Sequence, residues 1–147
     1  MKRDQIINEI IEKQKAVIQN LLATIKEYRT AADMDEESTH DAEDYSHVSQ
    51  AKDMQLRYEK MLAEAEQNLA FLESEKKMSH PEIENGAVIE TDKNILFVGI
   101  AVPAFQLGDK DVISFSEEAP IFGKLKGKKV GETVKIGDKT HEILAFG

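Results

Sequence analysis

The chain contains no cysteine and no tryptophan, and residues 1–78 contain neither proline nor glycine. The absence of cysteine excludes disulfides, thiolate zinc sites and cysteine nucleophiles. No apolar run approaches the roughly 20 residues that a membrane-spanning helix needs. The charged N-terminal residues also lack the apolar core of a signal peptide. We therefore expect a cytoplasmic protein without a membrane partner.

Basic residues are the minority among the charged side chains, with 19 Lys and Arg against 28 Asp and Glu and a formal net charge of -9. Such a protein repels nucleic-acid phosphates unless its cations cluster. The basic cluster of this chain surrounds Gly127 and consists of Lys124, Lys126, Lys128 and Lys129. It predicts either a solvated turn or a contact with an acidic protein surface or with RNA.

Residues 7–28 and 48–72 carry apolar side chains at heptad spacing, which predicts two long amphipathic helices. The first seam is Ile7, Ile11, Gln14, Ile18, Leu21, Ile25 and Tyr28, and the second is Val48, Ala51, Gln55, Tyr58, Leu62, Ala65, Leu69 and Leu72. Each seam is too narrow for a globular bundle, so we expect an antiparallel coiled-coil hairpin. Between the seams lie residues 33–44, of which seven of twelve are acidic. We expect this acidic segment at the tip of the hairpin.

The pattern changes after residue 80, because all eight glycines and all three prolines lie beyond it. Short β-branched runs predict strands over residues 87–90, 95–102, 111–116, 133–136 and 139–146. A turn at Gly137 and Asp138 joins the last two strands, and a short helix is expected over residues 120–125. The prediction is an α+β protein with a helical hairpin over residues 1–78 and a small, mostly antiparallel β domain over residues 81–147.

Residues 113–136 read ISFSEEAPIFGKLKGKKVGETVKI. This stretch, together with the domain order, resembles the Gre-type bacterial transcription elongation factors. Their C-terminal signature places Ser-Pro and an aliphatic residue before a short helix, a Gly-Lys turn and a closing hairpin. Ala119 stands here in place of the signature serine. The positions that fall in register are Pro120, Ile121, Leu125, Gly127 and Lys128.

The resemblance implies that the C-terminal domain has the FKBP-like fold of prolyl isomerases and docks on RNA polymerase. Pro120 and the lysines at 124, 126, 128 and 129 would bind this partner. The hairpin would enter the secondary channel and stimulate cleavage of backtracked transcripts. The protein would then be an accessory factor, not an enzyme. It would have no resident cofactor, would share Mg²⁺ with the polymerase active site and would meet nucleic acid only within the elongation complex. We expect a monomer.

Cleavage-active members of the family carry an Asp and a Glu three residues apart, followed by Asn or Ser, a variable residue, Glu and Tyr. Alignment on Tyr45 places Asp44 on the Glu that precedes the family tyrosine. It also places Asp41 on the catalytic Glu and Ser38 on the catalytic Asp.

A one-residue insertion instead places Glu37 and His40 on the catalytic pair. Glu37 with Asp41, or Asp41 with Asp44, would present two carboxylates on one helical face. Glu37, Asp41 and Asp44 are therefore the predicted catalytic residues. Within the polymerase complex, Glu37 and Asp41 are the predicted transient Mg²⁺ ligands.

Other interpretations remain open for the same residues. An acidic helix junction is also typical of a solvated loop with carboxylates favoured by the helix dipole. His40, Asp44 and His47 share a helical face, which we interpret as a solvated polar face and not as a metal site. A non-cleaving regulator would occupy the channel without chemistry. A structural coiled-coil protein would self-associate, with Gln14 and Gln55 setting the register.

Overall fold

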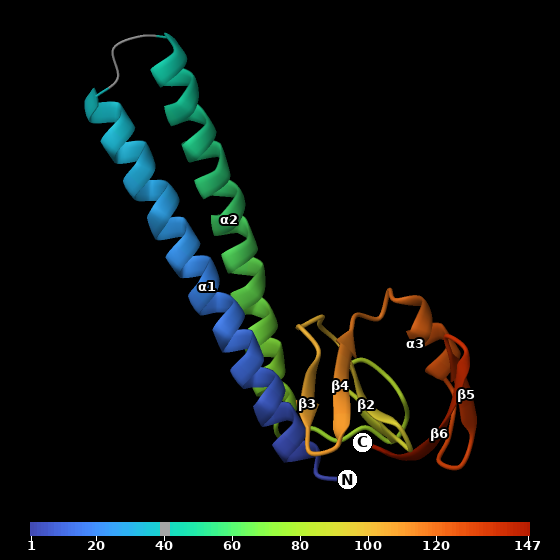
Figure 1. Ribbon diagram of the computed structural model, residues 1–147. Helices are drawn as coiled ribbons and strands as arrows, with labels where there is room; N and C mark the ends of the chain where they lie inside the picture. Colours follow the sequence, from blue (N-terminus) through green and yellow to red (C-terminus); the bar gives the residue numbers. More distant parts are fainter. Residues whose placement is uncertain (39–41) are drawn as a thin grey trace. The chain divides into compact units, whose positions relative to one another are not determined.

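The computed structural model describes the backbone of residues 1–38 and 42–147, and the side chains of residues 1–32 and 49–147. The elements in chain order are α1 (Arg3–Ser38), α2 (Ala42–Glu75), β1 (Val88–Thr91), β2 (Asn94–Val98), β3 (Phe105–Leu107), β4 (Lys110–Phe115), α3 (Pro120–Leu125), β5 (Thr133–Ile136) and β6 (Lys139–Phe146) (Figure 1). The predicted α+β class is confirmed, with the helical region first and the sheet second.

The two long helices run antiparallel and side by side between residues 14 and 70 (Figure 1). The Tyr28 and Tyr58 rings stack with centroids 5.6 Å apart. Ile18, Leu21 and Ala65 form a buried cluster along the seam. Neither proline nor glycine interrupts these helices, so the apolar stripe continues from turn to turn. The seam residues Ile18, Leu21, Tyr28, Tyr58 and Ala65 therefore lie on the inner face of the helix pair.

The sheet has six strands in the order β3-β4-β2-β1-β6-β5. Strands β2 and β4 are parallel, and the other neighbouring pairs are antiparallel. The expected strands near residues 87–90, 111–116, 133–136 and 139–146 and the helix over residues 120–125 are all present. The sheet is therefore mixed. Because β2 and β4 are parallel, the chain between them must cross from one end of the sheet to the other.

One expectation about the sheet was wrong, and one strand was missed. Residues 95–102 do not form one strand, because β2 ends at Val98. Beyond it the Val102 amide donates to the Ser114 hydroxyl at 3.1 Å instead of continuing a backbone ladder. Strand β3 was not predicted at all. Its signal was the Gly108–Asp109 turn into β4, the same residue pair that marked the β5–β6 turn.

Both faces of the sheet are covered. Leu96 and Val98 belong to the core cluster that also contains Leu125 of α3. Phe97 lies between them in β2 and so points to the opposite face, where its ring centroid lies 6.5 Å from that of Phe71 in α2. The end of α2 thus covers the face of the sheet that lies opposite α3.

The chain divides into two compact units, one formed by residues 1–13 and 71–147 and the other by residues 14–70. The first turns of α1 and the end of α2 therefore belong with the sheet. This division crosses both long helices, whereas the sequence pattern changes near residue 80. The burial of Ile6 and Ile10 beside Ile7 and Ile11 gives α1 a wider apolar stripe at this end.

Candidate functional site

The predicted catalytic residues lie outside the described side chains. Glu37 and Asp44 belong to α1 and α2, and Asp41 falls in the short stretch between them. Ser38, His40 and His47 are outside the described side chains too. Their assignment therefore remains a prediction from the sequence.

The predicted docking residues gather around α3. Pro120 opens this helix, a position where the missing amide hydrogen costs nothing. Leu125 is fully buried against the sheet, which leaves Lys124 and Lys126 exposed beside it. Gly127 follows with a φ of 82°, the left-handed region that turns the chain away from the helix.

Residues 124–139 carry six lysines against two acidic side chains. Among the described residues, none of these lysines forms an ion pair. Lys124 Nζ instead lies 3.4 Å from the carbonyl oxygen of Lys135. Val130, with 58 % of its surface exposed, is the largest exposed apolar side chain in this stretch. We call the six lysines and Val130 the lysine patch, and its charge is the reverse of the protein's net charge.

A buried ionic cluster that the sequence did not suggest centres on Arg3. Its guanidinium donates at 2.8 Å to the carbonyl oxygens of Gly86 and Gly147, and at 2.9 Å to those of Glu75 and Met78. It also binds Glu75 Oε2 at 2.9 Å, and the two side chains are only 10 % and 8 % exposed. One side chain thus ties the start of α1 and the end of α2 to the segment before β1 and to the last residue of the chain.

His80 completes this cluster between two carboxylates. Its Nε2 lies 2.8 Å from Glu75 Oε2, and its Nδ1 lies 2.7 Å from Glu84 Oε1. The imidazole ring of His80 therefore bridges the Glu75 and Glu84 carboxylates. Gly86 must lack a side chain, since its φ is +96° and a Cβ atom there would lie 2.5 Å from Glu75 Cδ. The cluster has a structural role, since it holds several segments of the sheet-containing unit together.

A second polar group lies at the β1–β2 turn. Burial lowers the pKa of His141, which favours the neutral imidazole. The Asp92 carboxylate accepts a 2.8 Å hydrogen bond from the Glu142 amide, and this bond lowers the pKa of Asp92. Thr91 Oγ1 accepts from the Asn94 amide at 3.0 Å and so closes the turn. The bond from Glu142 ties the turn to β6, and the bond from Asn94 closes the turn, so both have a structural role.

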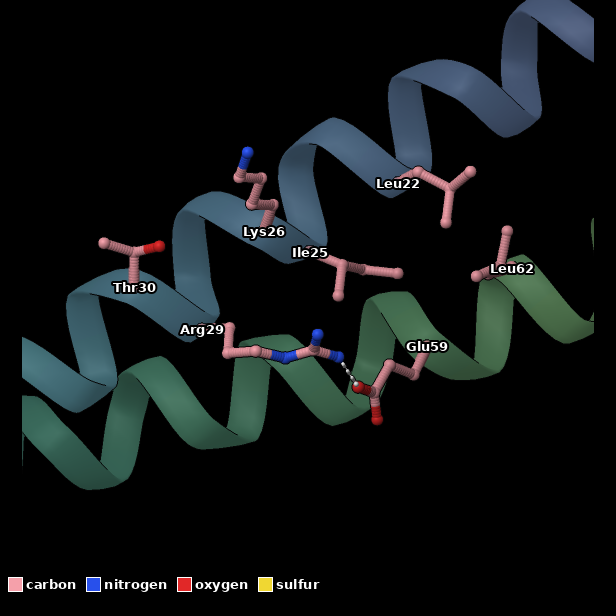
Figure 2. Close-up of a pocket in the computed structure, with 7 residues that line it drawn as sticks. All are labelled: Leu22, Ile25, Lys26, Arg29, Thr30, Glu59 and Leu62. Carbon is pink, nitrogen blue, oxygen red and sulfur yellow. Dashed lines mark hydrogen bonds and ion pairs between the residues drawn. The ribbon is translucent and has the colours of Figure 1, made fainter.

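The helix pair carries a cleft of about 640 Å³ on one side (Figure 2). Its residues are Leu22, Ile25, Lys26, Arg29, Thr30, Glu59 and Leu62. Ile25 and Leu62 point into the gap between the helices, and Arg29 Nη2 reaches across to Glu59 Oε1 at 3.3 Å (Figure 2). This ion pair is largely exposed, and solvent screening makes such pairs weak.

Comparisons with known proteins add no relative: no family model, curated protein or solved structure matches the chain. Within the described part of the chain, no helix has a stretch long and apolar enough to cross a membrane. In the same part, no group of three or more His, Asp or Glu side chains is placed to hold a metal ion.

Proposed function

We propose that this protein is a transcription elongation factor that binds RNA polymerase and stimulates cleavage of backtracked transcripts. Its helix pair acts as a coiled-coil hairpin that enters the secondary channel, and its C-terminal domain, with an FKBP-like fold, docks outside. The observation that carries the proposal is the order of elements. A pair of long antiparallel helices precedes a six-stranded sheet whose short helix begins at Pro120, within the stretch that resembles the Gre-type signature.

The length of the helices suits this role. Helix α1 has 36 residues and α2 has 34. At 1.5 Å per residue, helices of this size extend about 50 Å. The seam that holds them together is narrow, and the outer faces stay polar for the walls of an aqueous channel.

The acidic segment is the proposed reactive end. Glu37, Asp41 and Asp44 supply carboxylate oxygens, the donor type that Mg²⁺ prefers. A second Mg²⁺ at the polymerase active site would stabilise the attacking and leaving oxygens of phosphodiester cleavage. The task of this chain is to deliver and orient those carboxylates, and the polymerase remains the enzyme.

The lysine patch fits the docking role. It is the part of the described surface where uncompensated positive charge gathers beside α3, in a protein whose net charge is -9. Positive charge opposite an acidic partner speeds encounter and orients the complex.

The decisive experiment is RNA cleavage in a stalled, backtracked elongation complex with the polymerase of the same organism. A Glu37→Gln/Asp41→Gln variant should lower the stimulated rate on the order of 100-fold, while polymerase binding is retained. The matched control is Glu64→Gln/Glu66→Gln, which removes the same charge from two exposed positions of α2 and should leave cleavage unchanged.

An altered carboxylate spacing favours a second candidate, a regulator that occupies the channel without chemistry. The tip lacks the family's Asp and Glu three residues apart followed by the Glu-Tyr pair. In that case the wild-type protein would bind polymerase and slow nucleotide addition, but transcripts would not shorten. Absence of polymerase binding would refute both candidates.

A further inference from the structure

The lysine patch contains a rigid turn over residues 129–132. The Glu132 amide donates to the carbonyl oxygen of Lys129 at 3.0 Å, and the Lys129 amide donates to Glu132 Oε2 at 2.8 Å. Gly131 occupies the left-handed region, with a φ of 90°. Two hydrogen bonds and a glycine therefore close this turn.

The same turn is fastened to the sheet. The Gly131 amide donates to the carbonyl oxygen of Ile143 at 2.8 Å, and the Ile143 amide donates to that of Glu132 at 2.9 Å. Ile143 is fully buried in strand β6. The position of Val130 is thus set by the core of the domain, although its own side chain is outside the core.

Val130 is presented to solvent with 58 % of its surface exposed. A valine at this place contributes little to folding, because it buries less than half of its surface. Held by a fixed backbone, however, it loses little conformational entropy when a partner covers it. A pre-organised apolar side chain that directly follows two lysines, Lys128 and Lys129, suits the role of an interface anchor with charged neighbours.

The chemistry of the surroundings favours a protein partner over nucleic acid. Residues 117–147 contain no arginine, the residue most suited to bidentate phosphate contacts. The two phenylalanines of this stretch, Phe122 and Phe146, are packed against the core, so no exposed ring is available to stack on a base. A valine also gains nothing from a phosphate backbone. An acidic protein surface with an apolar recess satisfies both the lysines and the valine.

We propose that Val130 is the apolar anchor of the lysine patch and that the patch docks on an acidic protein surface with a recess for this side chain. The inference rests on the proposed function in taking that surface to be part of RNA polymerase. Val130 holds the complex together after contact, and the lysines increase the rate of encounter.

The test measures association and dissociation rates of the full-length chain with the polymerase of the same organism at several salt concentrations. Val130→Ser should weaken binding about 10-fold, through faster dissociation and with an unchanged dependence on salt. Its control is Ile113→Thr, since Ile113 is also exposed (38 %) but lies on β4, which β2 and β1 separate from β6. This control should bind within about 2-fold of wild type.

A charge variant completes the test. Lys126→Glu/Lys129→Glu should lower the association rate about 10-fold and flatten its salt dependence. Wild-type affinity in Val130→Ser overturns the anchor, and if transcript cleavage persists the proposed function still stands. Failure of the wild type to bind polymerase overturns both. Binding of single-stranded RNA alone that is lost in the lysine variant but intact in Val130→Ser would replace the protein partner by a nucleic acid.

Discussion

An arginine–glutamate pair links α1 to α2 in each of the two units, and the two pairs have opposite surroundings. Arg29 and Glu59 are 60 % and 37 % exposed, and one 3.3 Å contact joins them. Arg3 and Glu75 are 10 % and 8 % exposed, and their site contains five hydrogen bonds from the guanidinium alone. A buried charged group needs protein hydrogen-bond partners for all of its polar atoms, whereas water can replace a partner at the surface.

This difference shows how each unit is held together. The helix pair relies on a narrow seam in which buried residues such as Ile18, Leu21 and Ala65 alternate with half-buried ones such as Leu62 and Leu69. The sheet-containing unit relies on fully buried residues and on a few long-range polar contacts. A single substitution should therefore lower the free energy of unfolding far more in the sheet-containing unit than in the helix pair.

The largest expected effect comes from removing the buried guanidinium. Arg3→Gln should reduce the free energy of unfolding by about 3–5 kcal/mol, because Glu75 would remain buried without its full set of partners. Arg29→Gln, the matched exposed substitution, should cost less than about 1 kcal/mol. Urea titration followed by circular dichroism measures both. Equal losses in the two variants would contradict the contrast between the two ion pairs.

Shortening an apolar side chain in each unit tests the same difference between the sheet-containing unit and the helix pair. Leu96→Ala removes a fully buried side chain of β2 and should cost about 3 kcal/mol, since the sheet cannot collapse into the space. Leu69→Ala acts on a half-buried seam position of α2 and should cost about 1 kcal/mol. Denaturant midpoints at matched protein concentration report the two values. A larger loss at residue 69 would show that the seam carries more stability than its burial implies.

The smallest effect concerns pH and acts on the sheet-containing unit. Folding lowers the pKa of His141 through burial, and the pKa of Asp92 through its hydrogen bond from the Glu142 amide, below their ordinary values of 6.5 and 3.8. The unfolded chain then binds more protons in each window, so stability falls as the pH drops below about 6.5 and again below about 4. Thermal midpoints between pH 7 and 3 should show both steps. His141→Gln should remove the upper step only, and Asp92→Asn the lower one only; an unchanged profile in both variants would refute the assignment.

Most elements of the fold could be predicted because their signals are local. Heptad spacing without glycine or proline located α1 and α2, and β-branched runs between glycines located β1, β4, β5 and β6. The missed strand β3 has only three residues, and both of its ends are half-buried. An alternation of apolar and polar residues over three positions is too short to predict a strand. The end of β2 at Val98 escaped prediction because Ile100 and Val102 are buried too and mimic a continuing strand.

The candidate functional surfaces could likewise be predicted only in part. The lysines around Gly127 are visible in the sequence, and so are the acidic residues of the proposed tip. The exposure of Val130 was not, since it follows from hydrogen bonds between the 129–132 turn and Ile143. Nothing in the local pattern distinguishes a valine at a turn from a valine in a strand.

By itself the sequence determined the order and type of every element except β3, the heptad pattern of the long helices and the places where charge gathers. Those features depend on neighbours within one or two turns of helix or along one strand. Only the tertiary structure decided that Arg3 meets Glu75 and Gly147, residues 72 and 144 positions away. Such contacts depend on how distant segments share one core, and burial is the reason that we expect the loss of Arg3 to cost more stability than the loss of the exposed Arg29.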